Sequence, residues 1–296
     1  MSIGGIAAAL EREKYICGPG LAEALFVALV LPRPLLVEGA AGVGKTEVAK
    51  AMAAALGRPL VRLQCHAGMD ETRALYEWNY QKQLLALQVL VGSRTSGTDG
   101  ESKDGVRAAL TSIFSEEYLL ERPLLASIRS DKPVVLLVDE LDKTDEEFEA
   151  FLLELLAEFQ VTIPELGVVR ARSMPFVVLT SNSTRQLSDA LRRRCVFAYL
   201  AYPDVEREIL IINTRFPGAN AALARQVAEA SAYLRGLPRI LKKPSIAESL
   251  DWLAALTALG RERLDREAVR ATLGAVLKNR EDFDEAMKDD KFLDLH

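Results

Sequence analysis

The sequence predicts an α/β protein in which a parallel five-stranded sheet lies between two layers of helices and is followed by a small all-helical domain. Short apolar runs alternate with longer segments of helical periodicity, which is typical of this class. One run, Val134–Val138, is apolar and β-branched, as expected of a strand buried on both faces. No strand pattern remains after Pro203. We therefore predict an α/β core over residues 1–202 and a helical domain over 203–296.

The first part of the chain supplies two strands and several helices. Helices are predicted at 3–13, 21–31 and 45–56, the last ended by Gly57. A longer helix is predicted over Asp70–Val91. The segment 92–105, rich in Ser, Thr, Gly and Asp, is predicted to be a flexible insertion. The five predicted strands cover residues 34–38, 59–65, 134–138, 176–180 and 196–200.

The middle of the chain contains a helix and a hairpin. Thr144 and Glu147 have the spacing of a capping box, and apolar residues then recur at helical intervals as far as Phe159. The segment Val161–Ala171 carries two short β-type runs around Pro164–Gly167, which predicts a β-hairpin.

Composition and charge exclude several classes of protein. The 296 residues include 37 Lys+Arg and 42 Asp+Glu, for a net charge of −5, so a broad basic surface for nucleic acid is not expected. Three Cys and two His are too few and too scattered for a disulfide framework or a zinc site. No signal peptide is recognisable, and the longest apolar run, Leu21–Leu36, is broken by a glutamate and two prolines. We expect a cytoplasmic protein with neither a membrane nor a nucleic-acid partner.

The strongest motif is G-x-x-x-x-G-K-[ST], which directly follows the first predicted strand and opens a helix. Such a loop presents backbone N–H groups and a helix N-terminus to phosphate oxygens. Lys45 is expected to neutralise the β- and γ-phosphates of ATP, and the Thr46 hydroxyl to coordinate Mg²⁺. The predicted nucleotide-binding residues are Gly39, Ala40, Ala41, Gly42, Val43, Gly44, Lys45, Thr46 and Glu47.

An acidic pair, Asp139-Glu140, ends the most apolar strand. Two carboxylates at this place are costly to desolvate unless a cation lies opposite, and nucleotide-bound Mg²⁺ is such a cation. Asp139 is therefore predicted to bind nucleotide and metal, together with Thr46. Glu140 is predicted to orient the attacking water.

Two further polar features follow in the same order along the chain. Asn182 ends the next strand and is predicted to reach the γ-phosphate or the water. Arg192-Arg193-Arg194 precede the last strand, and three adjacent cations repel one another unless an anion is near. A γ-phosphate in an adjacent subunit would be that anion, which makes one of these residues an arginine finger acting in trans. A solvated charged face is the alternative interpretation.

This ordered series resembles the Walker A, Walker B, sensor 1 and arginine-finger motifs of AAA+ ATPases. The segments Leu63–Cys65, Tyr76–Tyr80, Glu121–Leu125 and Lys243–Glu248 resemble the MoxR branch. They are most similar to the CoxD-like ATPases that accompany molybdenum-containing carbon monoxide dehydrogenase. The likeness runs from about Tyr15 to Leu259.

The resemblance implies a hexameric ring that hydrolyses ATP at each subunit interface. It implies that the hairpin 161–171 is a pre-sensor 1 insertion, and that a von Willebrand factor A domain protein and a metalloenzyme client are partners. It also implies that the helical domain is a lid in which many relatives carry a sensor 2 arginine. This chain has Lys242-Lys243-Pro244-Ser245 there, so either Lys243 substitutes for that arginine or the lid contacts the nucleotide more weakly. Arg194 aligns best with the finger and Arg193 is second.

Two other functions remain open at this point. A nucleotide-switched binding module, in which ATP gates partner docking and hydrolysis is incidental, fits the unusual lid and the hairpin. A DNA-associated AAA+ motor shares the core, although the acidic net charge argues against it.

Overall fold

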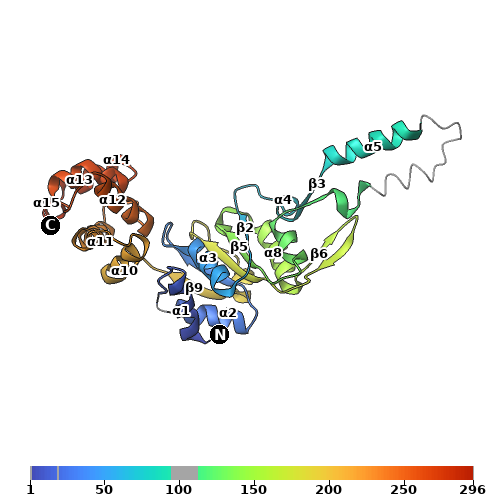
Figure 1. Ribbon diagram of the computed structural model, residues 1–296, viewed down its shortest axis with the longest axis horizontal. Helices are drawn as coiled ribbons and strands as arrows, with labels where there is room; N and C mark the ends of the chain where they lie inside the picture. The colour runs from blue at the N-terminus through green and yellow to red at the C-terminus, as the bar shows by residue number, and fades with distance from the viewer. Residues whose placement is uncertain (1, 19, 95–112, 296) are drawn as a thin grey trace.

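The main sheet has five strands, all parallel, in the order β2-β5-β8-β1-β9. The protein is described from a computed structural model covering residues 2–18, 20–94 and 113–295, without the side chains of residues 90–94. The predicted parallel five-stranded sheet is confirmed, and it occupies the centre of the molecule (Figure 1). Its strands are β1 (Leu35–Gly39), β2 (Leu60–Gln64), β5 (Val135–Asp139), β8 (Phe176–Ser181) and β9 (Val196–Leu200).

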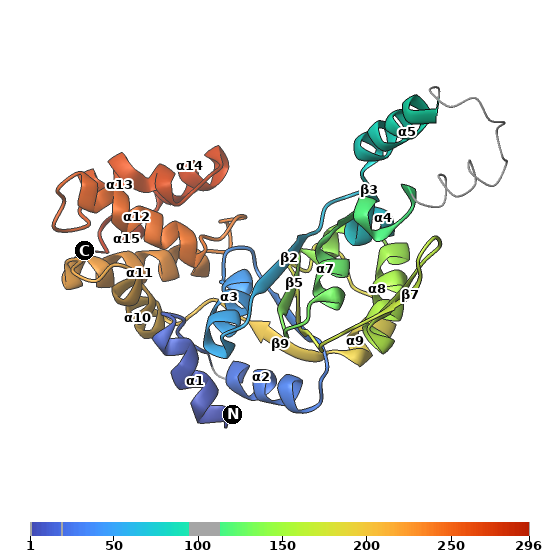
Figure 2. The same cartoon turned by 45° about the vertical axis from the view of Figure 1, so that its right-hand side comes forward.

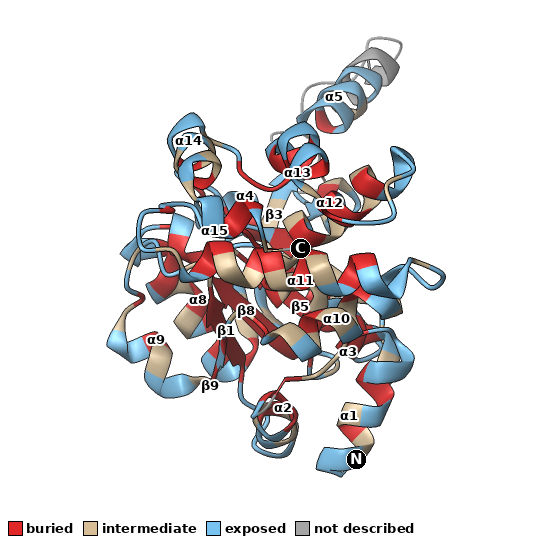
Figure 3. Ribbon diagram, turned by 90° about the vertical axis from the view of Figure 1, so that its left-hand side faces the viewer, coloured by how far each residue is buried: buried red, intermediate tan, exposed pale blue. Residues whose placement is uncertain are grey.

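Helices cover both faces of this sheet, which gives the predicted three-layer arrangement (Figure 2). One apolar cluster joins α1–α3 to one face of the sheet, and a second joins α7 and α8 to the other. The inner strands β1, β5 and β8 are buried along their whole length (Figure 3), because both their faces meet helices. The helices of these layers are α1 (Ile3–Arg12), α2 (Leu21–Val30), α3 (Lys45–Leu56), α7 (Pro123–Arg129), α8 (Glu146–Glu158) and α9 (Asp189–Arg194).

The single long helix predicted over Asp70–Val91 is wrong. The segment forms α4 (Glu71–Leu75), strand β3 (Tyr76–Trp78) and α5 (Tyr80–Arg94), and β3 pairs antiparallel with β4 (Leu119–Glu121). Trp78 interrupts the helix because its ring is buried and packs edge-on against Phe114, with centroids 5.4 Å apart. Of the predicted insertion 92–105, residues 92–94 end α5, and the rest lies outside the described residues.

The hairpin predicted over Val161–Ala171 is present as β6 (Gln160–Ile163) and β7 (Gly167–Arg170). The helix before it is capped one residue later than predicted. Asp145, not Thr144, accepts a hydrogen bond from the N–H of Phe148, while the Thr144 hydroxyl donates to the carbonyl of Leu141 within the turn η2 (Leu141–Lys143). Both residues are good caps, and the turn decides between them.

Beyond Leu200 the described chain is helical and has its own apolar cluster around Trp252. The division of the chain into domains near residue 202 stays a prediction. Within the described residues, no helix is long and apolar enough to cross a membrane. These elements are α10 (Val205–Arg215), α11 (Ala221–Gly236), α12 (Ile246–Ala258), α13 (Arg266–Thr272), η3 (Leu273–Ala275), α14 (Arg280–Lys288) and α15 (Asp290–Leu293); η1 (Glu116–Tyr118) lies earlier, before β4.

Candidate functional site

The glycine loop joins the end of β1 to the start of α3, as predicted. Gly42 and Gly44 adopt φ angles of 73° and 94°, which side chains with a Cβ rarely adopt. A Cβ on Gly42 would also lie 2.3 Å from the Ser245 hydroxyl oxygen at the start of α12. Glycine is therefore required here both by the turn and by the approach of the C-terminal helices.

Lys45 lies inside the curve of this loop. Its Nζ donates to the carbonyl oxygens of Gly39, at 2.8 Å, and Ala40, at 2.6 Å, and the residue is buried. Burial lowers the pKa of Lys45, and the negative charges of Asp142, Asp139 and Glu140 oppose that shift. A cation is thus held at the concave side of the loop, where the backbone can receive a phosphate.

The Asp139 carboxylate ends β5 and is surrounded by donors from three other elements. It accepts hydrogen bonds from the hydroxyls of Thr46, at 3.1 and 3.2 Å, and Thr180, at 2.5 Å, and from Arg62 Nη2 at 2.6 Å. The predicted Thr46 and Asp139 pair is therefore brought together. A hydroxyl and a carboxylate side by side are the hard oxygen donors that Mg²⁺ prefers, so these residues fit that ion.

Glu140 directly follows and has a left-handed backbone, with φ of 58°. One carboxylate oxygen accepts from Gln64 Nε2 at 2.8 Å and from Lys143 Nζ at 2.5 Å. The other accepts from Asn182 Nδ2 at 3.4 Å. The backbone N–H of Glu140 donates to Thr180 Oγ1, and this bond helps to hold the rare conformation. The predicted neighbours Glu140 and Asn182 thus meet beside Asp139.

Asp142 fixes the segment that carries Asn182. Its carboxylate accepts from the backbone N–H groups of Asn182 and Thr184, at 3.1 and 3.0 Å, and from the Thr184 hydroxyl. Burial alone would raise the pKa of Asp142, but these hydrogen bonds outweigh it and hold the pKa below its usual range. The carboxylate therefore stays charged and anchors the end of β8.

The arginine run does not act as one unit. Arg192 is paired with Glu38 at 2.5 Å and lies 5.2 Å from the Phe197 ring. Arg194 donates to the Leu153 carbonyl at 3.0 Å, and Arg193 is exposed. Within the described residues, no hydrogen bond or ion pair joins any of the three to the loop 39–46 of the same chain. Neither Arg193 nor Arg194 therefore contacts the glycine loop of its own chain within the described residues.

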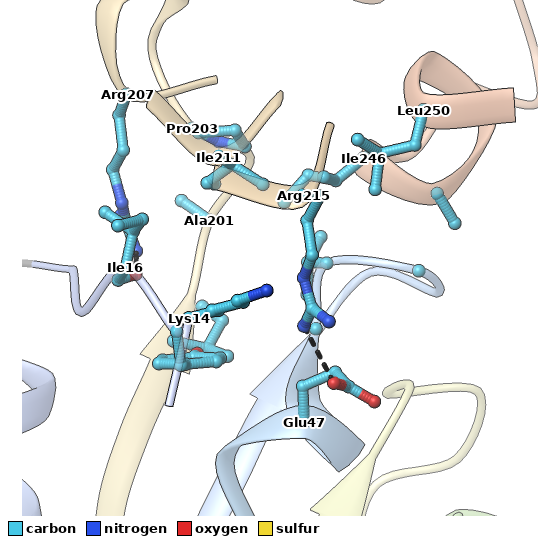
Figure 4. Close-up of a pocket in the computed structure, with 16 residues that line it drawn as sticks. Lys14, Ile16, Glu47, Ala201, Pro203, Arg207, Ile211, Arg215, Ile246 and Leu250 are labelled. Carbon is cyan, nitrogen blue, oxygen red and sulfur yellow. Dashed lines mark hydrogen bonds and ion pairs between the residues drawn. The ribbon is translucent and has the colours of Figure 1, made fainter. Parts of the chain in front are cut away.

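A cavity of about 320 Å³ lies between the glycine loop and the C-terminal helices (Figure 4). Its walls come from the segment after α1, the loop, the end of β9, α10 and α12. Figure 4 shows Arg215 reaching from α10 to Glu47 of α3, where Nη2 lies 2.8 Å from the carboxylate. The predicted nucleotide-binding residues Gly42, Val43, Gly44 and Glu47 all line this cavity.

Lys243 is not among the residues around this cavity. Its Nζ donates instead to the carbonyl of Arg235 at 2.5 Å, at the end of α11. The structure therefore does not bring Lys243 to the glycine loop. Its assignment as sensor 2 stays a prediction.

Sequence reasoning missed Arg62, Gln64, Thr180 and Arg215. Arg62 and Gln64 are two residues apart on β2 and both are exposed, with the buried Leu63 between them, so they lie on the same side of the strand. This period-two pattern was visible in the sequence of residues 59–65. Pairing of β2 with β5 sets Gln64 opposite Asp139 in the ladder. Thr180 and Arg215 carried no comparable signal, because their contacts depend on long-range packing.

Residues 34–195 match the family described as AAA domain (dynein-related subfamily), and this range contains the glycine loop, Asp139-Glu140 and the arginine run. The chain belongs to this family. Protein NorQ of Paracoccus denitrificans is 28% identical over 252 residues, which cover 81% of this chain and 78% of NorQ. The expected AAA+ ATPase of the MoxR type is thereby confirmed, and with it nucleotide binding.

Solved structures of RuvB from Thermotoga maritima are also similar. The RuvB Holliday junction branch migration motor matches with a TM-score of 0.44 and 19% identity, over 90% of this chain and 68% of that chain. A proline-to-glycine mutant of the same RuvB matches with a TM-score of 0.47 and 21% identity, over 88% of this chain and 69% of that chain. At these scores the likeness carries no argument about what this AAA+ protein acts on.

Proposed function

We propose that this AAA+ ATPase hydrolyses ATP in a Mg²⁺-dependent reaction and couples it, within a ring, to the maturation of a metalloenzyme client. One observation supports ATP hydrolysis above all: four polar side chains come together near the buried Lys45. Thr46 is hydrogen-bonded to Asp139, and Asn182 is hydrogen-bonded to the adjacent Glu140. These side chains come from the start of α3, the end of β5 and the segments that follow β5 and β8. A purely structural glycine turn would need none of them.

Each residue has one role in this proposal. Lys45 and the loop backbone bind the phosphates, and Thr46 and Asp139 hold the metal, which would supply charge neutralisation at the phosphates. Glu140 accepts a proton from, and orients, the attacking water, and Asn182 positions the same water or the γ-phosphate. The cavity behind Gly44 receives the base and sugar between the core and the helical domain of residues 203–296.

Two substitutions separate binding from chemistry. Lys45→Ala should abolish binding of a fluorescent ATP analogue, because it removes the cation that lies within the loop's curve. Glu140→Gln should keep binding but lower turnover about 100-fold or more. Glu154→Gln, on the exposed side of α8, is the matched carboxylate control. Full turnover in the Glu140→Gln protein would overturn the role of Glu140.

Arg194, with Arg193 as the second choice, is proposed to reach the γ-phosphate of the adjacent subunit. Both are exposed, whereas Arg192 is committed to Glu38. Arg194→Ala or Arg193→Ala subunits are mixed with Lys45→Ala subunits, which bind no nucleotide but supply an intact arginine. Rescue of turnover identifies the finger, and absence of rescue at every ratio for both variants counts against action in trans.

The hexamer, the von Willebrand factor A domain partner, the cytoplasmic location and the CoxD-like client rest on family resemblance. The relationship to NorQ supports the MoxR type without choosing a client. The client assignment is tested by copurification with the Glu140→Gln protein, which should bind ATP without hydrolysing it. A von Willebrand factor A domain protein and a metalloenzyme should copurify only when ATP is present. ATP-dependent capture without any turnover would instead favour a nucleotide-switched binding module, and DNA-stimulated turnover would favour a DNA motor.

A further inference from the structure

Arg62 occupies the carboxylate that the proposed metal must use. Its Nη2 lies 2.6 Å from Asp139 Oδ2, the oxygen that also accepts from the Thr46 hydroxyl. Asp139 is almost fully buried, with 4% of its side chain exposed, whereas 46% of the Arg62 side chain is exposed. A buried anion is thus neutralised by a cation whose side chain remains half in solvent.

This arrangement favours exchange of one cation for another. A buried carboxylate needs a positive partner, and within the described residues Arg62 is the one that contacts Asp139 directly. A divalent ion at the same oxygen would face the Arg62 charge at close range, where like charges repel strongly. Binding of the ion and retention of the Arg62–Asp139 pair therefore weaken each other.

Arg62 has a second partner to which it can remain attached. The same Nη2 also donates to Gln64 Oε1, two residues along β2 and on the same side of the strand. The guanidinium can leave Asp139 without losing all its hydrogen bonds, and 46% of the Arg62 side chain is already exposed to solvent. The cost of releasing Asp139 is consequently low.

We propose that Arg62 is a positioning residue that excludes free divalent cations from the Asp139 site until a nucleotide delivers the metal. The inference rests on the proposed function of Thr46 and Asp139. Without nucleotide, Arg62 outcompetes a hydrated ion because it is tethered beside its partner. With nucleotide, phosphate oxygens add ligands and negative charge, and the balance shifts to the metal.

The test measures binding of Mn²⁺ alone to nucleotide-free protein by electron paramagnetic resonance. Wild type is expected to bind weakly, and Arg62→Gln about five- to tenfold more tightly, since one opposing charge is removed. Arg62→Lys restores the charge and should return the affinity toward the wild-type value. Arg172→Gln, which removes a similarly exposed cation paired with Asp131 elsewhere, should leave Mn²⁺ binding unchanged.

The Arg62→Gln, Asp139→Asn double variant tests whether the additional Mn²⁺ binds at Asp139. It should lose the increase in Mn²⁺ affinity that Arg62→Gln produces. Unchanged affinity in Arg62→Gln, or a gain that survives Asp139→Asn, overturns the inference. Nucleotide binding and turnover of the wild type are measured in parallel. If the wild type binds and hydrolyses nucleotide but Arg62→Gln does not change Mn²⁺ affinity, only the role of Arg62 is rejected. If the wild type neither binds nor hydrolyses nucleotide, the proposed function itself is rejected.

Discussion

Two buried carboxylates of this protein each meet an arginine, but the two pairs are built differently. In the sheet, Asp139 accepts one hydrogen bond from the half-exposed Arg62. In the C-terminal helices, Glu208 accepts two from Arg235, at 2.5 and 2.8 Å, and the two side chains are only 0% and 7% exposed. Arg235 also donates to the Pro244 carbonyl at 2.7 Å.

The Glu208–Arg235 pair is the permanent one of the two. Arg235 lies 5.1 Å from the Tyr202 ring and donates to Ser249, so it ties the segment after β9 to α10, α11 and α12. Burial keeps solvent from replacing these contacts, whereas solvent already surrounds half of Arg62. We conclude that the helical pair fixes the segment before α12, which covers the glycine loop, and that the sheet pair is able to open.

The largest expected effect comes from breaking the permanent pair. Arg235→Ala leaves Glu208 charged and buried without a partner, and should lower the free energy of unfolding by about 3–5 kcal/mol. Urea unfolding, followed by the fluorescence of Trp252 in a Trp78→Phe background, measures this change. Arg225→Ala, which breaks an exposed pair with Glu206, is the control. If Arg235→Ala lowers the free energy of unfolding by less than about 1 kcal/mol, the Arg235–Glu208 pair is no more permanent than the Arg62–Asp139 pair.

Asp282 is a third buried carboxylate, and hydrogen bonds to N–H groups take the place of an arginine partner. It is buried and accepts from the N–H groups of Leu241 and Lys242, at 2.7 and 2.9 Å, and from Asn279 Nδ2. Burial by itself would raise the pKa of Asp282, but these hydrogen bonds lower it overall. Because the folded pKa is below the unfolded one, the stabilisation is present above the unfolded pKa and is lost as pH falls through the folded pKa.

Asp282→Asn should therefore cost about 1–2 kcal/mol at neutral pH, through loss of charged hydrogen bonds. The difference from wild type should shrink as the pH falls below about 4. Urea midpoints at neutral pH and at about pH 3 measure it, with Asp284→Asn, on the exposed side of α14, as the control. A difference that grows on acidification would contradict the stated sign.

The Arg192–Glu38 pair is intermediate, with 33% and 10% of the side chains exposed. Arg192→Ala should destabilise the protein by about 1 kcal/mol. Arg193→Ala, next to it and exposed, should change stability by less than about 0.5 kcal/mol. Thermal unfolding of both variants gives the comparison. Equal effects would mean that the exposure of the arginine does not rank these pairs.

The smallest effect on stability is expected for Arg62→Gln. Its arginine is half-exposed, and the Thr46 and Thr180 hydroxyls still donate to Asp139 when Arg62 is replaced, so the loss of stability should stay below about 1 kcal/mol even though metal binding changes. The same urea unfolding measurement applies. A loss above about 2 kcal/mol would place Arg62 with Arg235 as a permanent partner.

The strands and helices of the sheet core were predictable from the sequence, whereas the break in the helix predicted over Asp70–Val91 was not. The strand–loop–helix from Leu35 to Leu56 and the last strand, Val196–Leu200, lie where their residues predict them, since local propensity and burial agree there. The helix predicted across Trp78 failed because pairing of β3 with β4, much further along the chain at Leu119, overrides local helix preference.

Within the site, the glycine loop, Asp139-Glu140 and Asn182 could be recognised from the sequence alone, because each follows a recognisable strand and the carboxyl ends of parallel strands share one edge. The cations and hydrogen-bond donors that surround these residues depend on how the strands and helices pack together. Strand order β2-β5-β8 places Arg62 and Thr180 on either side of Asp139, and packing of α10 brings Arg215 to Glu47. Such pairs join residues far apart in the sequence, and no local pattern encodes a partner that only lateral strand order and helix packing select.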